Sequence, residues 1–137
     1  TDPLTTIDGT TQPAYTLGDI AIDGTNTAPL SHGLNVAASS TEIYGLKVVN
    51  FDEINNAGVF VDANIQLSDI VIGGPGRGNI IGGSHHGIFV NFISDCNNIT
   101  IQSNFIGVDP SAGMANIGNT INGVVIMQGV CTNVLRA

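Results

Sequence analysis

Histidine side chains are the first groups in this sequence that could do chemistry, because imidazole binds metal ions and exchanges protons near neutral pH. His85 and His86 are adjacent, and His32, like His86, stands directly before a glycine. Neighbouring residues of a strand point to opposite faces, so His85 and His86 are not expected to bind one ion together. Ala57 takes the place between His32 and His86 in the repeat described below. The pattern therefore favours solvated turn histidines over a metal centre.

An aspartate-containing loop offers a second kind of chemistry, since calcium is bound by oxygen atoms. The segment VDPSAGMAN supplies Asp109, Ser111 and Asn116 as oxygen donors. Calcium takes about six to eight oxygens and usually several carboxylates. One carboxylate is too few, so the segment is interpreted as an ordinary Asp-Pro turn. The sequence thus predicts no metal ion and no cofactor.

The composition indicates what kind of fold must position these groups. The chain has 137 residues, of which 42% are hydrophobic and only 10% charged, with 18 glycines and no tryptophan. Isoleucine and valine favour strands, whereas so few charges leave little for amphipathic surface helices. The net charge of −8 disfavours nucleic acid and anionic membrane surfaces. No apolar run reaches the ~20 residues of a membrane helix, so no membrane insertion is expected.

Four glycines open the same short pattern, in which two apolar side chains fall on one face of a strand. The openers are GLNV from Gly33, GVFV from Gly58, GIFV from Gly87 and GVVI from Gly123. A second strand-like segment follows at 41–45, 68–74, 97–102 and 132–135, and a third at 46–51, 78–83 and 104–107. The second and third elements also occur before Gly33, at 5–9 and 19–24. The chain is therefore a repeat of three short strands.

One repeat cannot bury its own apolar face, whereas stacked repeats can pair each strand with its equivalent in the next coil. The sequence thus predicts an all-β fold, a parallel β-helix of about four to five coils with three parallel sheets. Polar insertions at 74–78 and 108–120 are expected as loops between fixed strands. The alternative is an antiparallel sandwich, with hairpin-like turns at 7–10, 22–25 and 122–123.

Residues 5–134 resemble the right-handed parallel β-helix repeats of large secreted bacterial proteins. The resemblance rests on TIDGTTQPAY at 6–15, YGLKVVNF at 44–51, GRGNIIGG at 76–83 and NNITIQSNFIGVD at 97–109. It implies a right-handed winding, a pectate-lyase-like fold, and a secreted or cell-surface location. This fold carries lyases, hydrolases, adhesins and spacers alike, so it does not by itself imply an activity.

The catalytic groups of enzymes with this fold are not evident in the sequence. Pectate lyases use a basic residue near several acidic ones, but Lys47, Arg77 and Arg136 have no evident carboxylate cluster in their own or the adjacent coil. Polygalacturonases use grouped aspartates near a Gly-His-Gly element, which SHHG at 84–87 imitates poorly. No catalytic residue is therefore predicted, and the chain is expected not to be an enzyme.

Two cysteines hold equivalent places in consecutive coils. Cys96 lies three residues before Ile99, and Cys131 lies three before Val134. Leu67 holds the same place one coil earlier, which indicates an inward or half-buried position. Stacked equivalents lie ~5 Å apart, within disulfide range. The pair is either a disulfide or two small buried hydrophobic groups.

Asparagines come just before the second strand, at Asn97, Asn98 and Asn133, where they are expected to form a structural ladder between coils.

Taken together, residues 1–137 are expected to form a single domain, either a fragment of a longer solenoid or a stacking unit. The predicted role is a non-catalytic structural or interaction module of an exported or cell-surface protein, such as an adhesin, spacer or fibre. The alternative is a polysaccharide-binding or polysaccharide-cleaving module. Expected partners are other copies or further chain at the ends of the stack, and a glycan, but not nucleic acid.

Overall fold

The computed structural model describes residues 3–63, 66–92, 96–127 and 131–136. In these ranges the chain is all-β, and its helices are the single 3-10 turns η1 (Gly9–Thr11) and η2 (Pro110–Ala112). None of the helical segments in these ranges has the length and apolarity that crossing a bilayer requires. The expected shortage of helix is confirmed.

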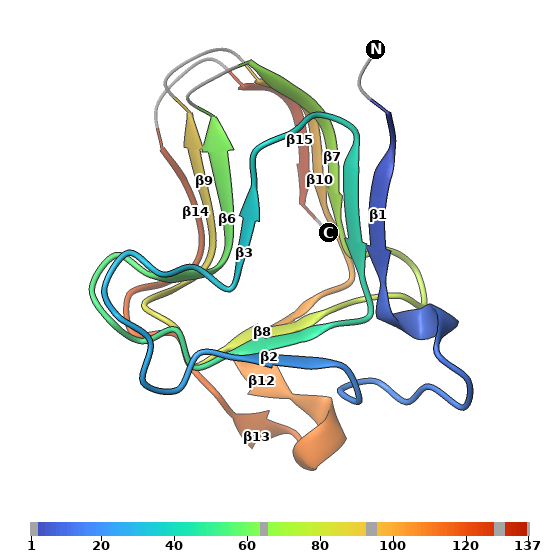
Figure 1. The fold of residues 1–137 in the computed structure, drawn as a ribbon, viewed down its shortest axis with the longest axis vertical. Helices are drawn as coiled ribbons and strands as arrows, with labels where there is room; N and C mark the ends of the chain where they lie inside the picture. The colour runs from blue at the N-terminus through green and yellow to red at the C-terminus, as the bar shows by residue number, and fades with distance from the viewer. Residues whose placement is uncertain (1–2, 64–65, 93–95, 128–130, 137) are drawn as a thin grey trace.

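Three parallel sheets form three sides around a common interior (Figure 1). Sheet A contains β1 (Thr5–Asp8), β4 (Thr41–Tyr44), β7 (Leu67–Ile72), β10 (Cys96–Ile101) and β15 (Cys131–Arg136). Sheet B contains β2 (Ala21–Asp23), β5 (Lys47–Val49), β8 (Ile80–Gly82) and β11 (Phe105–Ile106). Sheet C contains β3 (Leu34–Val36), β6 (Ala57–Ala63), β9 (His86–Phe92) and β14 (Asn122–Met127). We call one passage through sheets A, B and C a coil.

The strand register matches the sequence repeat. Leu34 pairs with Val59, Val59 with Ile88, and Ile88 with Val124, so the residues after the four opening glycines form one row. The parallel pairing excludes the antiparallel sandwich and confirms three parallel sheets. The arrangement is compatible with a parallel β-helix.

Inward rows of isoleucine and valine fill the interior. In one row of sheet A, Ile43 is 1% exposed and Ile72 is fully buried, whereas Ile7 at the edge of the same sheet is 39% exposed. Burial in this row therefore depends on a neighbouring coil on each side. Fully burying such a side chain stabilises a fold by about 1.5–3 kcal/mol, so the coil contacts are the main source of stability.

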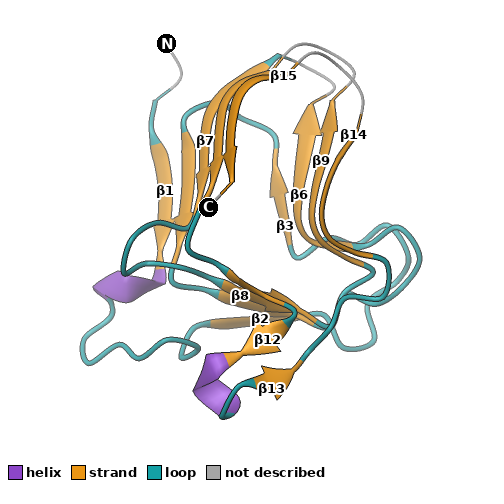
Figure 2. Cartoon of the chain, turned by 180° about the vertical axis from the view of Figure 1, so that it is seen from behind, coloured by secondary structure: helices purple, strands orange, loops and turns teal. Residues whose placement is uncertain are grey.

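The insertion at 108–120 forms a small excursion outside sheet B, with β12 (Val108–Asp109) antiparallel to β13 (Ala115–Asn116) around η2 (Figure 2). Ile80 alternates with the inward Ile81 and is nevertheless fully buried. A Cβ on Gly18 would lie 2.7 Å from Ser111 Oγ and 3.6 Å from Ile80 Cδ1. The excursion and the loop around Gly18 therefore cover the outer face of sheet B.

The turns at 7–10 and 22–25 are not hairpins. In each, an aspartate accepts hydrogen bonds from the backbone N–H and the hydroxyl of the threonine two residues later: Asp8 from Thr10, and Asp23 from Thr25. Asp109 makes the same pair of bonds with Ser111. This D-x-S/T turn directs the chain sideways out of a strand, so a hairpin does not follow.

Candidate functional site

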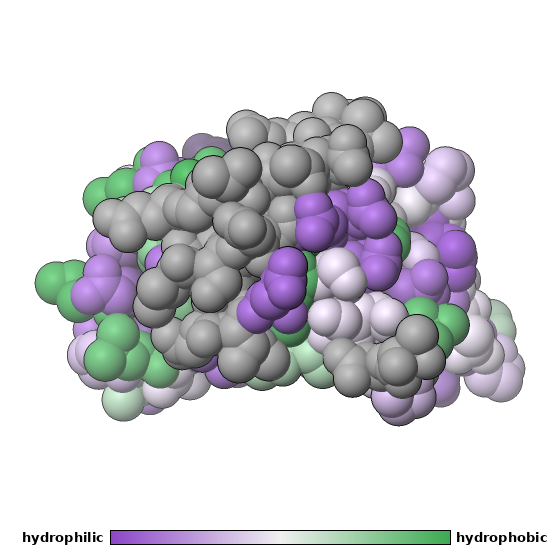
Figure 3. All heavy atoms as spheres, turned by 90° about the horizontal axis from the view of Figure 1, so that it is seen from above, coloured by the Kyte–Doolittle hydropathy of each residue, from purple (hydrophilic) through white to green (hydrophobic). Residues whose placement is uncertain are grey.

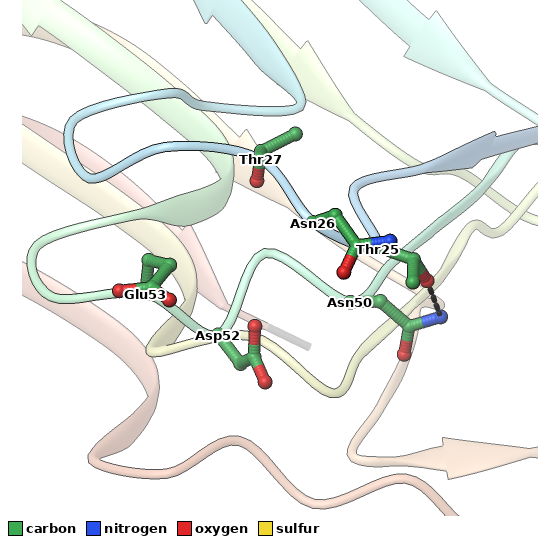
Figure 4. A pocket seen from close by; sticks show the side chains of 6 residues that line it. All are labelled: Thr25, Asn26, Thr27, Asn50, Asp52 and Glu53. Carbon is green, nitrogen blue, oxygen red and sulfur yellow. Dashed lines mark hydrogen bonds between the residues drawn. The ribbon is translucent and has the colours of Figure 1, made fainter.

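A polar hollow lies between the first two coils, where the turns after β2 and β5 run side by side (Figure 4). Its lining residues are Thr25, Asn26, Thr27, Asn50, Asp52 and Glu53. The side-chain oxygens of Asn26, Thr27 and Asp52 point into the space between the two turns. The hollow is thus rich in hydrogen-bond acceptors and carries negative charge.

Asp23 connects the two turns that line this hollow. Its Oδ1 accepts from Thr25 and from Asn50 Nδ2, at 3.0 Å for the asparagine, and so ties the first turn to the second. The hydroxyl of Thr25 and the amide of Asn50 hold the pKa of Asp23 below its usual value. The carboxylate is therefore ionised at neutral pH and serves as a structural acceptor.

The side chains of the hollow offer mainly hydrogen-bond acceptors. Within the described ranges, no group of three or more histidine, cysteine, aspartate or glutamate residues could hold a metal ion. Sugar hydroxyls, in contrast, can donate to the carboxylates of Asp52 and Glu53 and to the amide oxygen of Asn26. Sequence reasoning did not single out these residues, and their only signal was the clustering of oxygen-bearing side chains in two equivalent turns.

Lys47 forms an ion pair that the sequence did not predict. Its Nζ donates to Asp109 Oδ2 over 2.6 Å, and the side chain of Asp109 is only 3% exposed. The hydrogen bond from Lys47, with that from Ser111, holds the pKa of Asp109 below its usual value. The single carboxylate of this turn, which was predicted to be too few for calcium, is thus paired with a lysine from two coils away. Its other predicted oxygen donor, Asn116, accepts from Gly118 N–H instead.

Arg77 also contacts a carboxylate. Its guanidinium lies 3.8 Å from the centroid of the Tyr44 ring, and its Nη1 donates to Asp8 Oδ2 over 3.3 Å. Asp8 belongs to the first coil, outside the coils searched in the sequence. The pair is solvated, with 46% of the arginine side chain exposed, so it contributes at most about 1 kcal/mol. The side chain of Arg136 lies outside the described residues.

The histidines differ from their prediction in two ways. His86 is buried rather than solvated, with 8% exposure. The rings of His85 and His86 lie 4.7 Å apart, centroid to centroid, because His85 is in the turn before β9 and strand alternation does not apply to it. The predicted alignment of His32, Ala57 and His86 is confirmed, since Ala57 pairs with His86 and donates its N–H to His32 Nδ1.

Asparagine ladders connect the coils, as predicted for Asn98. Asn98 is left-handed, with φ 53°, and its Nδ2 donates to the equivalent Asp69 of the previous coil over 2.9 Å. Asn97 lies within β10, where it pairs with Thr132 and Ser68, and the side chain of Asn133 lies outside the described residues. A second ladder, which the sequence did not indicate, joins Asn79 to Asn104 beside sheet B.

The two cysteines are partners in the strand ladder. Cys96 pairs with Cys131 on one side and with Leu67 on the other, which confirms the predicted register. The side chains of Cys96 and Cys131 lie outside the described residues, so the two alternatives, a disulfide or two buried hydrophobic groups, both stay predictions.

The side of the stack seen in Figure 3 intersperses hydrophobic and hydrophilic side chains around the grey atoms. A scan against known protein families, a search of curated proteins and a search of solved structures find no match to this chain.

Proposed function

We propose that this chain is a structural or interaction module of an exported or cell-surface protein, built as a right-handed parallel β-helix of the pectate-lyase-like kind. The three parallel sheets and the matched strand register support the winding, and the motif resemblance supports its hand and location. The role of such a module is to present surfaces and to extend a stack, as in an adhesin, spacer or fibre.

The observation that carries this proposal is the open end of the stack. The strands β1, β2 and β3 each lie at the edge of their sheet. Beside them an apolar hollow is lined by Ile7, Leu34, Val36 and Ile43, residues whose rows are buried further along the stack. An exposed strand edge next to an apolar surface favours pairing with further strands. The partner that fits this end is a second copy of this chain.

The state of the basic side chains supports a non-catalytic role. In the described part of the chain, Lys47 is engaged by Asp109, and Arg77 by Asp8 and Tyr44. Side chains engaged in this way are not free to contact a substrate, which supports a role without catalysis.

Glycan binding is the second candidate, and the polar hollow at Asp52 and Glu53 is the observation that favours it. A glycan array together with turnover assays on acidic polysaccharides separates the two roles. The structural role predicts no turnover and no retained glycan. Turnover that Asp109→Ala abolishes, or glycan capture that Asp52→Ala abolishes and Asp62→Ala leaves intact, would establish the alternative instead.

A further inference from the structure

His32 closes the junction between the first two coils. It stands just before β3, and its Nδ1 accepts a hydrogen bond from the N–H of Ala57, the first residue of β6, over 3.1 Å. A ring nitrogen that accepts a hydrogen bond carries no proton, so the geometry assigns His32 as the neutral tautomer with its proton on Nε2. The junction is thus made by an imidazole nitrogen that acid would protonate.

The peptide group of Ala57 depends on this contact. Ala57 is fully buried, and its carbonyl accepts from Gly33 N–H over 2.9 Å. The two bonds to His32 and Gly33 hold the start of β3 against the start of β6. Protonation of Nδ1 would turn the acceptor into a donor and leave the Ala57 N–H buried without a partner, which is unfavourable.

The surroundings of the His32 ring have opposing effects on its pKa. The ring stacks on Phe60 with centroids 4.1 Å apart, and Asp62 of the same strand is the charged group that acts on it among the described residues. An aromatic face and a carboxylate both favour imidazolium. Burial opposes them and is the larger effect, so the pKa of His32 lies below its usual value.

The buried histidine, His86, is not placed in the same way as the half-buried His32. His86 lies in the same row two coils further on, and its Nδ1 faces the side chain of Asn122 at 3.3 Å. Burial and the neighbouring His85 lower the pKa of His86. A side-chain amide can rotate to offer its oxygen to a protonated ring, whereas the backbone N–H of Ala57 cannot. Acid sensitivity is therefore concentrated at the junction of the first two coils.

We infer that His32 is an acid-sensitive latch, whose protonation releases β3 from β6 and opens the first coil while the later coils stay paired. Once β3 has left, the edge of β6 that had paired with it is exposed, together with Val59, which had packed beside Leu34. The latch is independent of whether the module serves a structural or a glycan-binding role.

The direct readout is the protection factor of the Ala57 amide in hydrogen exchange, corrected for the intrinsic pH dependence of exchange. In the opened coil the imidazole has an ordinary pKa of ~6.5, so at pH ~5.5 its protonated form outnumbers its neutral form by about ten to one. Because protonation stabilises the opened coil, the equilibrium constant for opening increases by up to about tenfold between pH ~7.5 and ~5.5. The wild type is expected to show most of this loss of protection. Constant protection across this range would overturn the inference.

Two variants identify the responsible histidine. His32→Asn places an amide oxygen near the position of Nδ1, so it keeps the acceptor and cannot titrate; it is expected to make Ala57 protection independent of pH. His85→Asn removes a histidine that does not contact Ala57 and is expected to keep the wild-type loss. An unchanged loss in His32→Asn would refute the latch. If that variant does not fold, NMR titration of His32 in the wild type replaces it, and a His32 titration without a concurrent change at the Ala57 amide is the refuting result.

Discussion

Replacing Asn79 by alanine should cost more stability than removing any other single asparagine side chain among the described residues. Asn79 is fully buried, and its Oδ1 accepts from Leu46 N–H over 3.0 Å. Its Nδ2 donates to Ile43 O at 3.1 Å and to Asn104 Oδ1 at 2.9 Å. One amide thus connects the second, third and fourth coils.

The expected loss follows from what each partner retains. Ile43 O still accepts from Gly73 N–H, and Asn104 Oδ1 still accepts from the backbone of Asn79. Leu46 N–H, in contrast, is left buried with no acceptor, which costs about 1–3 kcal/mol. The two other lost bonds add about 0.5–1.5 kcal/mol each, so the sum is about 2–6 kcal/mol.

Urea unfolding at neutral pH measures this loss directly. The matched control is Asn116→Ala, since Asn116 is exposed and bonds only Gly118 N–H within its own turn; its effect should stay within about 0.5 kcal/mol. A loss below about 1 kcal/mol for Asn79→Ala, with an unchanged dependence on urea, would refute the assignment of this side chain as a connector of coils.

Three further perturbations test single contacts. Because the pKa of Asp109 is lowered in the fold, its ion pair stabilises the protein above pH ~4, the pKa of aspartate in the unfolded chain, and this stabilisation is lost as the pH falls. Asp109→Asn should therefore show a smaller drop in urea midpoint than the wild type between pH ~7 and ~3. An equal drop in both proteins would contradict this contribution. Gly33→Ala places a Cβ 2.5 Å from a backbone oxygen, whereas Gly123→Ala meets only a methyl group at 3.3 Å, so Gly33→Ala should lower the melting temperature further, by the equivalent of about 1–3 kcal/mol; equal melting temperatures would contradict the close coil contact. Cys96 and Cys131 should form a disulfide in oxidised protein, seen as linked peptides that separate on reduction; free thiols after oxidation would leave the pair as buried hydrophobic groups.

The sheets could be predicted from the sequence because their rows repeat in it. Period-two alternation after Gly33, Gly58 and Gly87 specifies which side chains face inward. A slip of one residue would turn every inward isoleucine outward, so the register follows from the rows alone. The pairing of Cys96 with Cys131 was predictable for the same reason.

The outer layer over sheet B could not be predicted, since periodicity does not specify where a loop packs. Asp109 meets Lys47 only because the excursion folds back across two coils. The Asp-Gly turns at 7–10 and 22–25 were hairpin-like only in the alternative sandwich, because Asp-Gly is common in both kinds of turn. The threonine hydroxyl two residues later distinguishes them. Strand alternation was used to separate His85 from His86, but it does not apply there, because His85 lies in the turn and the strand begins at His86.

Sedimentation velocity over a wide concentration range tests the proposed structural role most directly. The account predicts that the mass-average size rises above the 14.1 kDa of one chain as concentration increases. It also predicts that Ile7→Lys, which places a charge in the open apolar end, abolishes this rise, whereas Ile121→Lys, at an exposed position outside that hollow, leaves it unchanged. A single 14.1 kDa species at every concentration, or an equal effect of the two substitutions, would contradict pairing through the open end of the stack.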